Sequence, residues 1–343
     1  LQFGAEVHAR GRLIPALVVQ VAAQDYGATT RQRAWRWAHG VVDIRPIPAH
    51  YSINILNTQL DYMDSYLLQH EPWIRIGAFS MVFVAMAAWE AVAPRRLLAH
   101  PRRLRWPANL GIVALNSVLL RLVLPVTTIG FSVVAQERGW GLLNQLSISP
   151  AVALVFAVVA LDFIIYMQHV MFHAVPALWR LHRMHHTDLD FDVTTGARFH
   201  PVEIMLSAGV KLAAVAVLGP SPLAVLLFEV LLNATSMFNH GNVRLPIAID
   251  RVLRLFVVTP DMHRVHHSVF PHETNRNFGF NLPWWDRLFG TYLAQPSVDH
   301  EHLKIGIGNF REARELRLDR MLLQPFRGNV GGYPIGGREK VGQ

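Results

Sequence analysis

Residues 150–173, PAVALVFAVVALDFIIYMQHVMFH, decide the fold, because an apolar run from Ala151 to Tyr166 leads directly into two histidines. About 20 mostly apolar residues cross the hydrocarbon core of a bilayer, so residues Pro150–Gln168 predict a membrane-spanning helix. The composition agrees: 52% of the 343 residues are hydrophobic and only 16% are charged. Soluble domains carry about 25% charged residues. We therefore expect an integral membrane protein.

Four further segments are apolar enough to span or re-enter the membrane. They are Pro72–Ala93, Ala108–Ala135 with a candidate break at Pro125, Ile204–Leu218 and Leu223–Phe238. The turn Gly219-Pro220-Ser221-Pro222 joins the last two, since two prolines and a glycine end a helix. The predicted fold class is all-α: a membrane bundle of four to five spanning helices with a histidine-rich helical cap.

Three regions are expected along the chain. Residues 1–71 form a low-information N-terminal extension, residues 72–328 a membrane domain, and residues 329–343 a flexible C-terminal tail. A run of arginines between the first two spans, from Arg95 to Arg105, predicts a cytoplasmic loop, because short basic loops stay on that side. Counting crossings from this loop places residues 169–203, and those after about 239, on the cytoplasmic side of what we expect to be a bacterial inner membrane.

Histidine is the residue type on which the chemistry is expected to depend. The chain has 18 histidines and no cysteine, which excludes disulfides, cysteine-ligated iron–sulfur clusters and Cys-type zinc sites.

Three histidine clusters stand out: H-x-x-x-H at 169–173, and H-x-x-H-H at 182–186 and again at 263–267. Their members are His169, His173, His182, His185, His186, His263, His266 and His267. Residues three and four apart share a helix face. Eight imidazoles exceed the usual four ligands of zinc, so the clusters fit two metal ions.

A polar stripe is repeated in two of the predicted spans. Asp162, Tyr166, His169 and His173 are spaced i, i+4, i+7 and i+11, and Glu229, Asn233, Ser236 and His240 repeat this spacing. We expect the stripes to face a shared cavity, with His240 as a ninth ligand. The acids lie about 16 Å along the helix from the last histidine. They would therefore line the cavity, or pair with Arg121 or Lys211, with purely structural pairing as the alternative. His200, at the start of the fourth span, is a candidate to hydrogen-bond a ligand.

The three clusters in this order, with Asn275, Asn277, Gly279 and the run NLPWWDRLFGTY at 281–292, resemble the fatty acid hydroxylase / sterol desaturase superfamily. The resemblance covers roughly residues 72–328 and is greatest to bacterial members. It implies a membrane oxidoreductase that uses two histidine-ligated iron ions, O2 and external electrons to hydroxylate or desaturate a lipid or sterol. It also implies that the eight cluster histidines are the metal-binding and catalytic residues.

The chain departs from this family pattern at one point. Some relatives have a further H-x-x-x-H before the last cluster, where this sequence has serine at Ser236 and histidine at His240. Either the centre has one ligand fewer, or His200 or a water fills the position. Imidazole also binds zinc, so zinc in place of iron is an alternative.

The expected partners are a lipid substrate, the bilayer and a separate reductase, because the sequence has no flavin, nicotinamide or haem motif; no nucleic acid is expected. The alternative function is a membrane metal protein that is not an oxygenase. A metal transporter or sensor would spread its histidines near the membrane midplane, and a zinc hydrolase would need only about three ligands and an open position.

Overall fold

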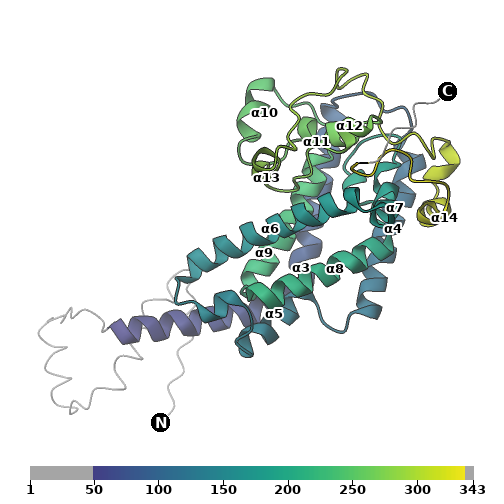
Figure 1. The fold of residues 1–343 in the computed structure, drawn as a ribbon. Helices are drawn as coiled ribbons and strands as arrows, with labels where there is room; N and C mark the ends of the chain where they lie inside the picture. Colours follow the sequence, from purple (N-terminus) through teal and green to yellow (C-terminus); the bar gives the residue numbers. More distant parts are fainter. Residues whose placement is uncertain (1–48, 337–343) are drawn as a thin grey trace, which may run out of the picture. The chain divides into compact units, whose positions relative to one another are not determined.

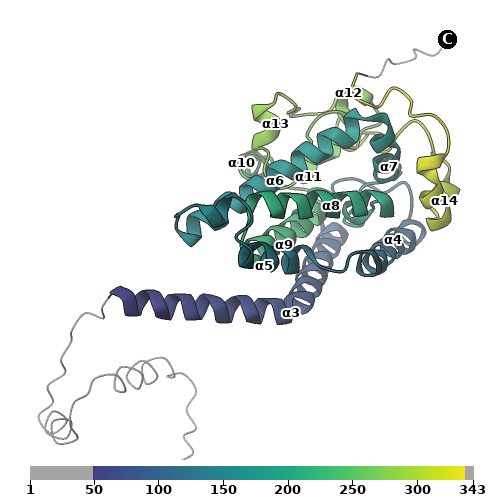
Figure 2. The ribbon, with the colours of Figure 1, turned by 60° about the horizontal axis from the view of Figure 1, so that its bottom comes forward.

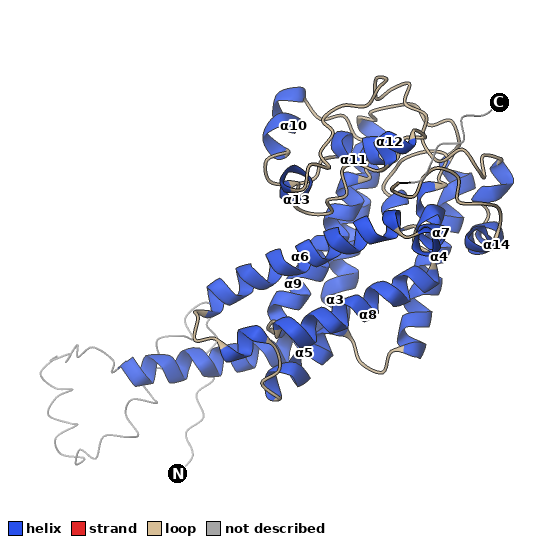
Figure 3. Ribbon diagram, viewed as in Figure 1, coloured by secondary structure: helices blue, strands red, loops and turns tan. Residues whose placement is uncertain are grey.

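The computed structural model describes residues 49–336, whose regular structure is entirely helical (Figure 1, Figure 3). Residues 1–48 of the predicted extension and residues 337–343 of the predicted tail lie outside the described part. The chain divides into two units, 1–59 and 60–343, and the first contributes only the beginning of helix α3 to the description. The predicted all-α class is confirmed.

The helices divide into a set of long helices and a set of short ones. The long ones are α3 (Ala49–Val92), α4 (Arg102–Val123), α6 (Pro150–Ala174), α8 (Pro201–Leu218) and α9 (Pro222–Asn239). The short ones are α5 (Thr128–Glu137), α7 (Pro176–His186), α10 (Ile247–Leu253), α11 (Pro260–His266), α12 (Pro271–Thr274), α13 (Trp284–Leu288) and α14 (Leu318–Leu323), with 3-10 turns η1 (Leu142–Gln145), η2 (Thr195–Ala197), η3 (Ala313–Leu316) and η4 (Gln324–Phe326). Five helical segments of the described residues are long and apolar enough to cross a membrane, as expected.

The predicted helix boundaries follow from proline and glycine. Helices α6, α8 and α9 each begin with proline, where a missing N–H costs nothing. The break at Pro125 is confirmed, because α4 ends at Val123 and α5 begins at Thr128. Gly219 ends α8 in the left-handed conformation with φ 65°. A Cβ there would lie 2.4 Å from the backbone oxygen of Trp140, so only glycine fits.

Helix α6 lies beside both α8 and α9 (Figure 2), and side chains of the three helices share an apolar core. Leu161 and Ile165 of α6 pack with Ala214 of α8 and Phe228 of α9. Each large side chain buried in this way contributes about 1.5–3 kcal/mol to stability. The other face of α6 is apolar and exposed, with Val155 at 60% of its full exposure, as expected of a helix that faces lipid.

A buried charge network joins α4 to residues 188–195. The guanidinium of Arg105 is fully buried and donates to both carboxylate oxygens of Asp188 at 2.7 Å and to Asp192 at 2.5 Å. Burial alone would raise the pKa of Asp188, but Arg105 and Arg198 together hold it well below its usual range. The network therefore ties α4 to the segment that directly follows the second histidine cluster.

Candidate metal centre

Nine histidines from four helices or their ends converge in the interior of the bundle, and all nine are buried. The first histidine group comprises His169, His173, His182, His186 and His266. The second histidine group comprises His185, His240, His263 and His267. Within each group the candidate ligand atoms all lie within 4.8 Å of one another. The structure thus brings together all eight cluster histidines and His240, as the sequence analysis expected.

Each H-x-x-H-H cluster is divided between the two groups. His182 and His186 of α7 belong to the first group, whereas His185 belongs to the second. In the cluster at 263–267 the division is reversed: only His266 belongs to the first group. Around the helix axis, residues i and i+4 lie about 40° apart, whereas residues i+3 and i+4 lie about 100° apart, so the last two rings of each cluster point in different directions. One short helix can therefore supply ligands to two adjacent metal ions.

Hydrogen bonds at Nδ1 hold most of these rings in place. Nδ1 of His182 contacts Glu203 Oε1 at 2.6 Å, and Nδ1 of His173 contacts Asn275 Oδ1 at 3.1 Å. The remaining Nδ1 bonds go to backbone oxygens: His169 to Phe278 (2.7 Å), His185 to Arg198 (3.3 Å), His240 to Ser236 (2.8 Å) and His266 to Arg276 (2.7 Å). Metal-binding histidines usually donate their second ring N–H in this way, which fixes the ring and its tautomer.

The Nε2 atoms of histidines in the same group lie close together. A ring that donates from Nδ1 carries a lone pair on Nε2. The Nε2 atoms of His169 and His182 are nevertheless 3.2 Å apart, as are those of His185 and His240. Two facing lone pairs repel unless a proton or a cation lies between them. Nε2 of His173 and of His266 has no hydrogen-bond partner although it is buried. The donor set therefore fits metal ions bound through Nε2.

Burial also favours the protonation state that binds metal. It lowers the pKa of His182 and of His240 to about 3, so both rings are neutral at pH 7. Neutral imidazole is the form that binds a metal ion.

Glu203 provides a test of the hydrogen bonds that orient the ligands. We expect Glu203→Ala to weaken metal binding about 10–100-fold, because His182 Nδ1–H loses its acceptor. Glu203→Gln should have a much smaller effect, since its amide oxygen can still accept from the ring. Metal retention against a series of chelators measures the difference. Equal retention by both variants would show that this hydrogen bond does not support binding.

Two candidate residues do not reach the histidine groups. His200 caps α8: its Nδ1 accepts from Val202 N at 3.2 Å, and its Nε2 donates to Leu322 O at 3.3 Å. The expectation that His200 supports a ligand is therefore corrected. Ser236 Oγ donates to Gly196 O at 2.7 Å and also points elsewhere. The second group is left with four imidazoles against five in the first.

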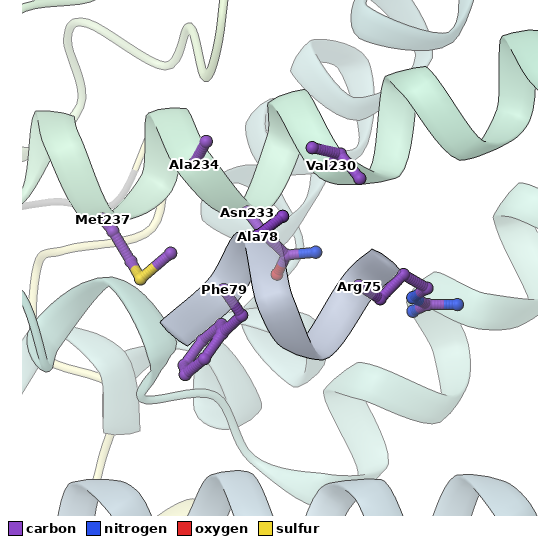
Figure 4. Close-up of a pocket in the computed structure, with 7 residues that line it drawn as sticks. All are labelled: Arg75, Ala78, Phe79, Val230, Asn233, Ala234 and Met237. Atoms are coloured by element: carbon purple, nitrogen blue, oxygen red, sulfur yellow. The ribbon is translucent and has the colours of Figure 1, made fainter. Parts of the chain in front are cut away.

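The two polar stripes share a cavity only in part. Glu229, Asn233 and Ser236 of the second stripe and His169 of the first line a cavity of about 250 Å³, and Glu229 pairs with Lys211 at 2.8 Å as expected. Asn233 also lines a much smaller pocket between α3 and α9, of about 10 Å³ (Figure 4).

Asp162 and Tyr166 instead contact the segment 281–291, which corrects their assignment to the cavity. Asp162 accepts hydrogen bonds from the indole N–H of Trp285 at 2.8 Å and from the backbone N–H groups of Asn281 and Leu282 at 3.3 Å. Tyr166 Oη contacts Thr291 Oγ1 at 3.0 Å. These two residues attach the segment after the last histidine cluster to the middle of α6.

Asp162→Asn is expected to destabilise the protein by about 1–3 kcal/mol, because an amide nitrogen in place of one carboxylate oxygen cannot accept these bonds. Metal content should not change, since Asp162 lies outside both histidine groups. Thermal unfolding and metal analysis of the purified variant check both statements. Asp319→Asn, at an exposed carboxylate, is the matched control. Metal loss without a lower unfolding temperature would contradict the structural role.

Sequence reasoning missed the residues that orient the ligands. No sequence pattern marks Glu203 as a partner of His182, although its Oε1 lies 2.6 Å from His182 Nδ1. The position of Asn275 in the family motif likewise does not show that it contacts His173. The backbone oxygens of Phe278 and Arg276 leave no side-chain signal at all, so no sequence pattern could have found them.

Comparisons with known proteins agree with the histidine pattern. The family model described as fatty acid hydroxylase matches residues 154–291, a range that includes all nine histidines. Over 147 residues the chain is 33% identical to the ornithine lipid hydroxylase OlsE of Rhizobium tropici, covering 43% of each chain. It is 30% identical to the alkylglycerol monooxygenase of Xenopus tropicalis, covering 39% of this chain and 29% of the relative. For the alkylglycerol monooxygenase of Homo sapiens the identity is 29%, with 40% and 30% covered.

These matches span less than half of the length of each relative. No solved structure matches the chain significantly. The resemblance inferred from the histidine clusters is confirmed.

Proposed function

We propose that this protein is a membrane oxidoreductase that uses O2 to hydroxylate a lipid C–H bond, because residues 154–291 match the family model described as fatty acid hydroxylase. The observation that carries the proposal is the pair of buried histidine groups whose Nε2 lone pairs face one another. The names of the relatives describe a lipid hydroxylase and a monooxygenase, which supports this reaction class over desaturation.

The five histidines of the first group would hold one iron ion and the four of the second group the other. When bound, the two ions supply the redox chemistry for O2 and an alkyl C–H bond, which no amino-acid side chain can supply. The protein holds the imidazoles neutral and fixed, and it excludes water by burying all nine rings. The cavity beside the first group would position the lipid.

We further propose that the site lies on the cytoplasmic side and receives electrons from a separate reductase. The arginine-rich loop contacts the helix that carries the last cluster, because Arg95 pairs with Asp261 of α11 at 3.2 Å. If the basic loop is cytoplasmic, the histidine groups lie close to the same face.

Metal and oxygen measurements on the purified full chain test the proposal. We expect two iron ions per chain, and O2 consumption that depends on a reductant and on added membrane lipid. Zinc alone with no O2 consumption would overturn the proposal and would favour a hydrolase or a transporter. Comparison of lipid extracts from cells with and without the gene would then identify the hydroxylated lipid.

A further inference from the structure

Helix α10 and the turn that follows it carry their apolar side chains on the outside. Their apolar residues that are at least half exposed are Ile247, Ile249, Val252, Leu255 and Phe256. Of the charged residues in the same stretch, Asp250 and Arg254 are buried and pair at 2.7 Å, and only Arg251 is exposed. A helix that faces water buries its apolar side and exposes its charged side. The reversed arrangement indicates that the surroundings of α10 are apolar.

Helix α13 extends this apolar surface. It lies next to α10 in both views of the ribbon (Figure 1, Figure 2), and the indole N–H of Trp284 donates to Leu255 O at 2.7 Å. Trp284, Leu288 and Phe289 are exposed. We call these three residues, together with the five exposed apolar residues of 247–256, the outer apolar surface. A group of large exposed apolar side chains of this size marks an interaction surface.

The outer apolar surface lies beside the middle of α6. Phe289 stacks on Phe163 with the ring centroids 5.9 Å apart, and the ring of Trp285 lies 4.8 Å from that of Phe163. Trp285 also donates to Asp162 at 2.8 Å. Asp162 and Phe163 lie about 18–20 Å along α6 from Pro150, at 1.5 Å per residue. The hydrocarbon core of a bilayer is about 30 Å thick, so α13 lies at the depth of the membrane and not beyond the end of the spanning helix.

The exposed face of α6 continues onto α13. Phe156, Phe163 and Met167 are spaced i, i+7 and i+11, so they share one face of α6. Phe156 and Met167 are exposed, and Phe163 between them is the residue on which Phe289 packs. The outer apolar surface is therefore continuous with the side of α6 that faces lipid.

The exposed charges beside the outer apolar surface are positive. Within residues 247–256 and 284–289, Arg251 and Arg287 are exposed, whereas the acids Asp250 and Asp286 are buried. Arginine side chains near a membrane surface extend their charged groups toward the lipid headgroups, and they are attracted to anionic lipids. The charge pattern therefore fits a bilayer that contains anionic phospholipid.

We propose that α10, the turn after it and α13 are embedded in the bilayer leaflet next to the histidine groups. The outer apolar surface lies among the acyl chains, with Arg251 and Arg287 at the phosphates. A soluble protein partner does not fit this surface, because it cannot reach the middle of a spanning helix. The histidine-rich cap is thus held in the membrane by two short helices as well as by the spanning ones. This placement does not depend on metal, O2 or the proposed oxygenase activity.

Fluorescent labels at single cysteines test the proposal, because the chain itself has no cysteine. The full-length variants Ile249→Cys and Leu288→Cys are labelled with a small fluorophore and reconstituted into vesicles of phosphatidylethanolamine and phosphatidylglycerol. Lipids with a nitroxide on the acyl chain quench a label in hydrocarbon, and iodide quenches a label in water. We expect strong quenching by the lipids at both positions. Iodide quenching should be about tenfold weaker than at a position in water, because ions are excluded from hydrocarbon.

Two further positions calibrate the measurement. Val298→Cys is the matched control for a label in water, because Val298 is also an exposed apolar residue but lies between Ser297 and Asp299. Val155→Cys, on an exposed part of α6, is the control for a label in lipid.

The pattern of quenching decides between the possible surroundings of the outer apolar surface. Iodide quenching at the two test positions as strong as at the Val298 control would overturn the proposal. Quenching by neither reagent would also overturn it, since a second copy of the chain or another protein surface would then cover these residues. Strong lipid quenching in a protein that never consumes O2 would support the proposal and contradict only the proposed function.

Discussion

Replacing His185 by alanine is expected to remove one of the two metal ions and to lower activity at least a hundredfold. The second histidine group has only four imidazoles, so this change leaves three. Three ligands are fewer than a closed four-coordinate site requires. Because both ions are proposed to act on one O2 molecule, loss of either should stop turnover. Elemental analysis of the purified variant and O2 consumption measure the two effects.

His266→Ala should affect metal content less than His185→Ala does. This change leaves four imidazoles in the first group, so metal should be bound more weakly but not lost outright. The control is His300→Ala, because His300 is also buried yet belongs to neither group. It should keep both ions. Retention of two tightly bound ions by the His185 variant would contradict the assignment of the second group.

The parts of the fold that depend on local sequence could be predicted. The apolar run before His169, the break at Pro125 and the turn at Gly219 follow from hydrophobic length and from the conformations of proline and glycine. The convergence of the histidines could also be expected, because spacings of three and four place them on one helix face.

The contacts that could not be predicted join residues far apart in the sequence. Asp162 appeared to belong to a stripe that faces a cavity, because helical spacing shows which residues share a face but not what that face contacts. Its partners, Asn281, Leu282 and Trp285, lie about 120 positions later. For the same reason, spacing alone could not show that each H-x-x-H-H cluster is divided between two groups. That division depends on how α7 and α11 approach each other.

Replacing Arg105 by methionine is expected to destabilise the protein by about 3–5 kcal/mol, the usual cost of removing one partner of a buried ion pair. The change leaves the carboxylates of Asp188 and Asp192 in the interior without their main partner. Asp188 follows the second histidine cluster by two residues, so a displaced segment would also move His185 and His186. We therefore expect metal to be lost at a lower temperature than in the unchanged protein. Thermal unfolding followed together with metal release measures both effects.

Arg103→Met is the matched control, because Arg103 lies two residues before Arg105 on the same helix and is exposed. Its effect should lie within about 0.5 kcal/mol, as for most surface substitutions. Neutralising the acids as well, in the variant Arg105→Met with Asp188→Asn and Asp192→Asn, should recover part of the lost stability, since unpaired charge is the main cost. If the single Arg105 variant unfolds at the same temperature as the Arg103 control, the network does not hold the second cluster in place. The orientation of α7 would then depend on the packing of its apolar side chains alone.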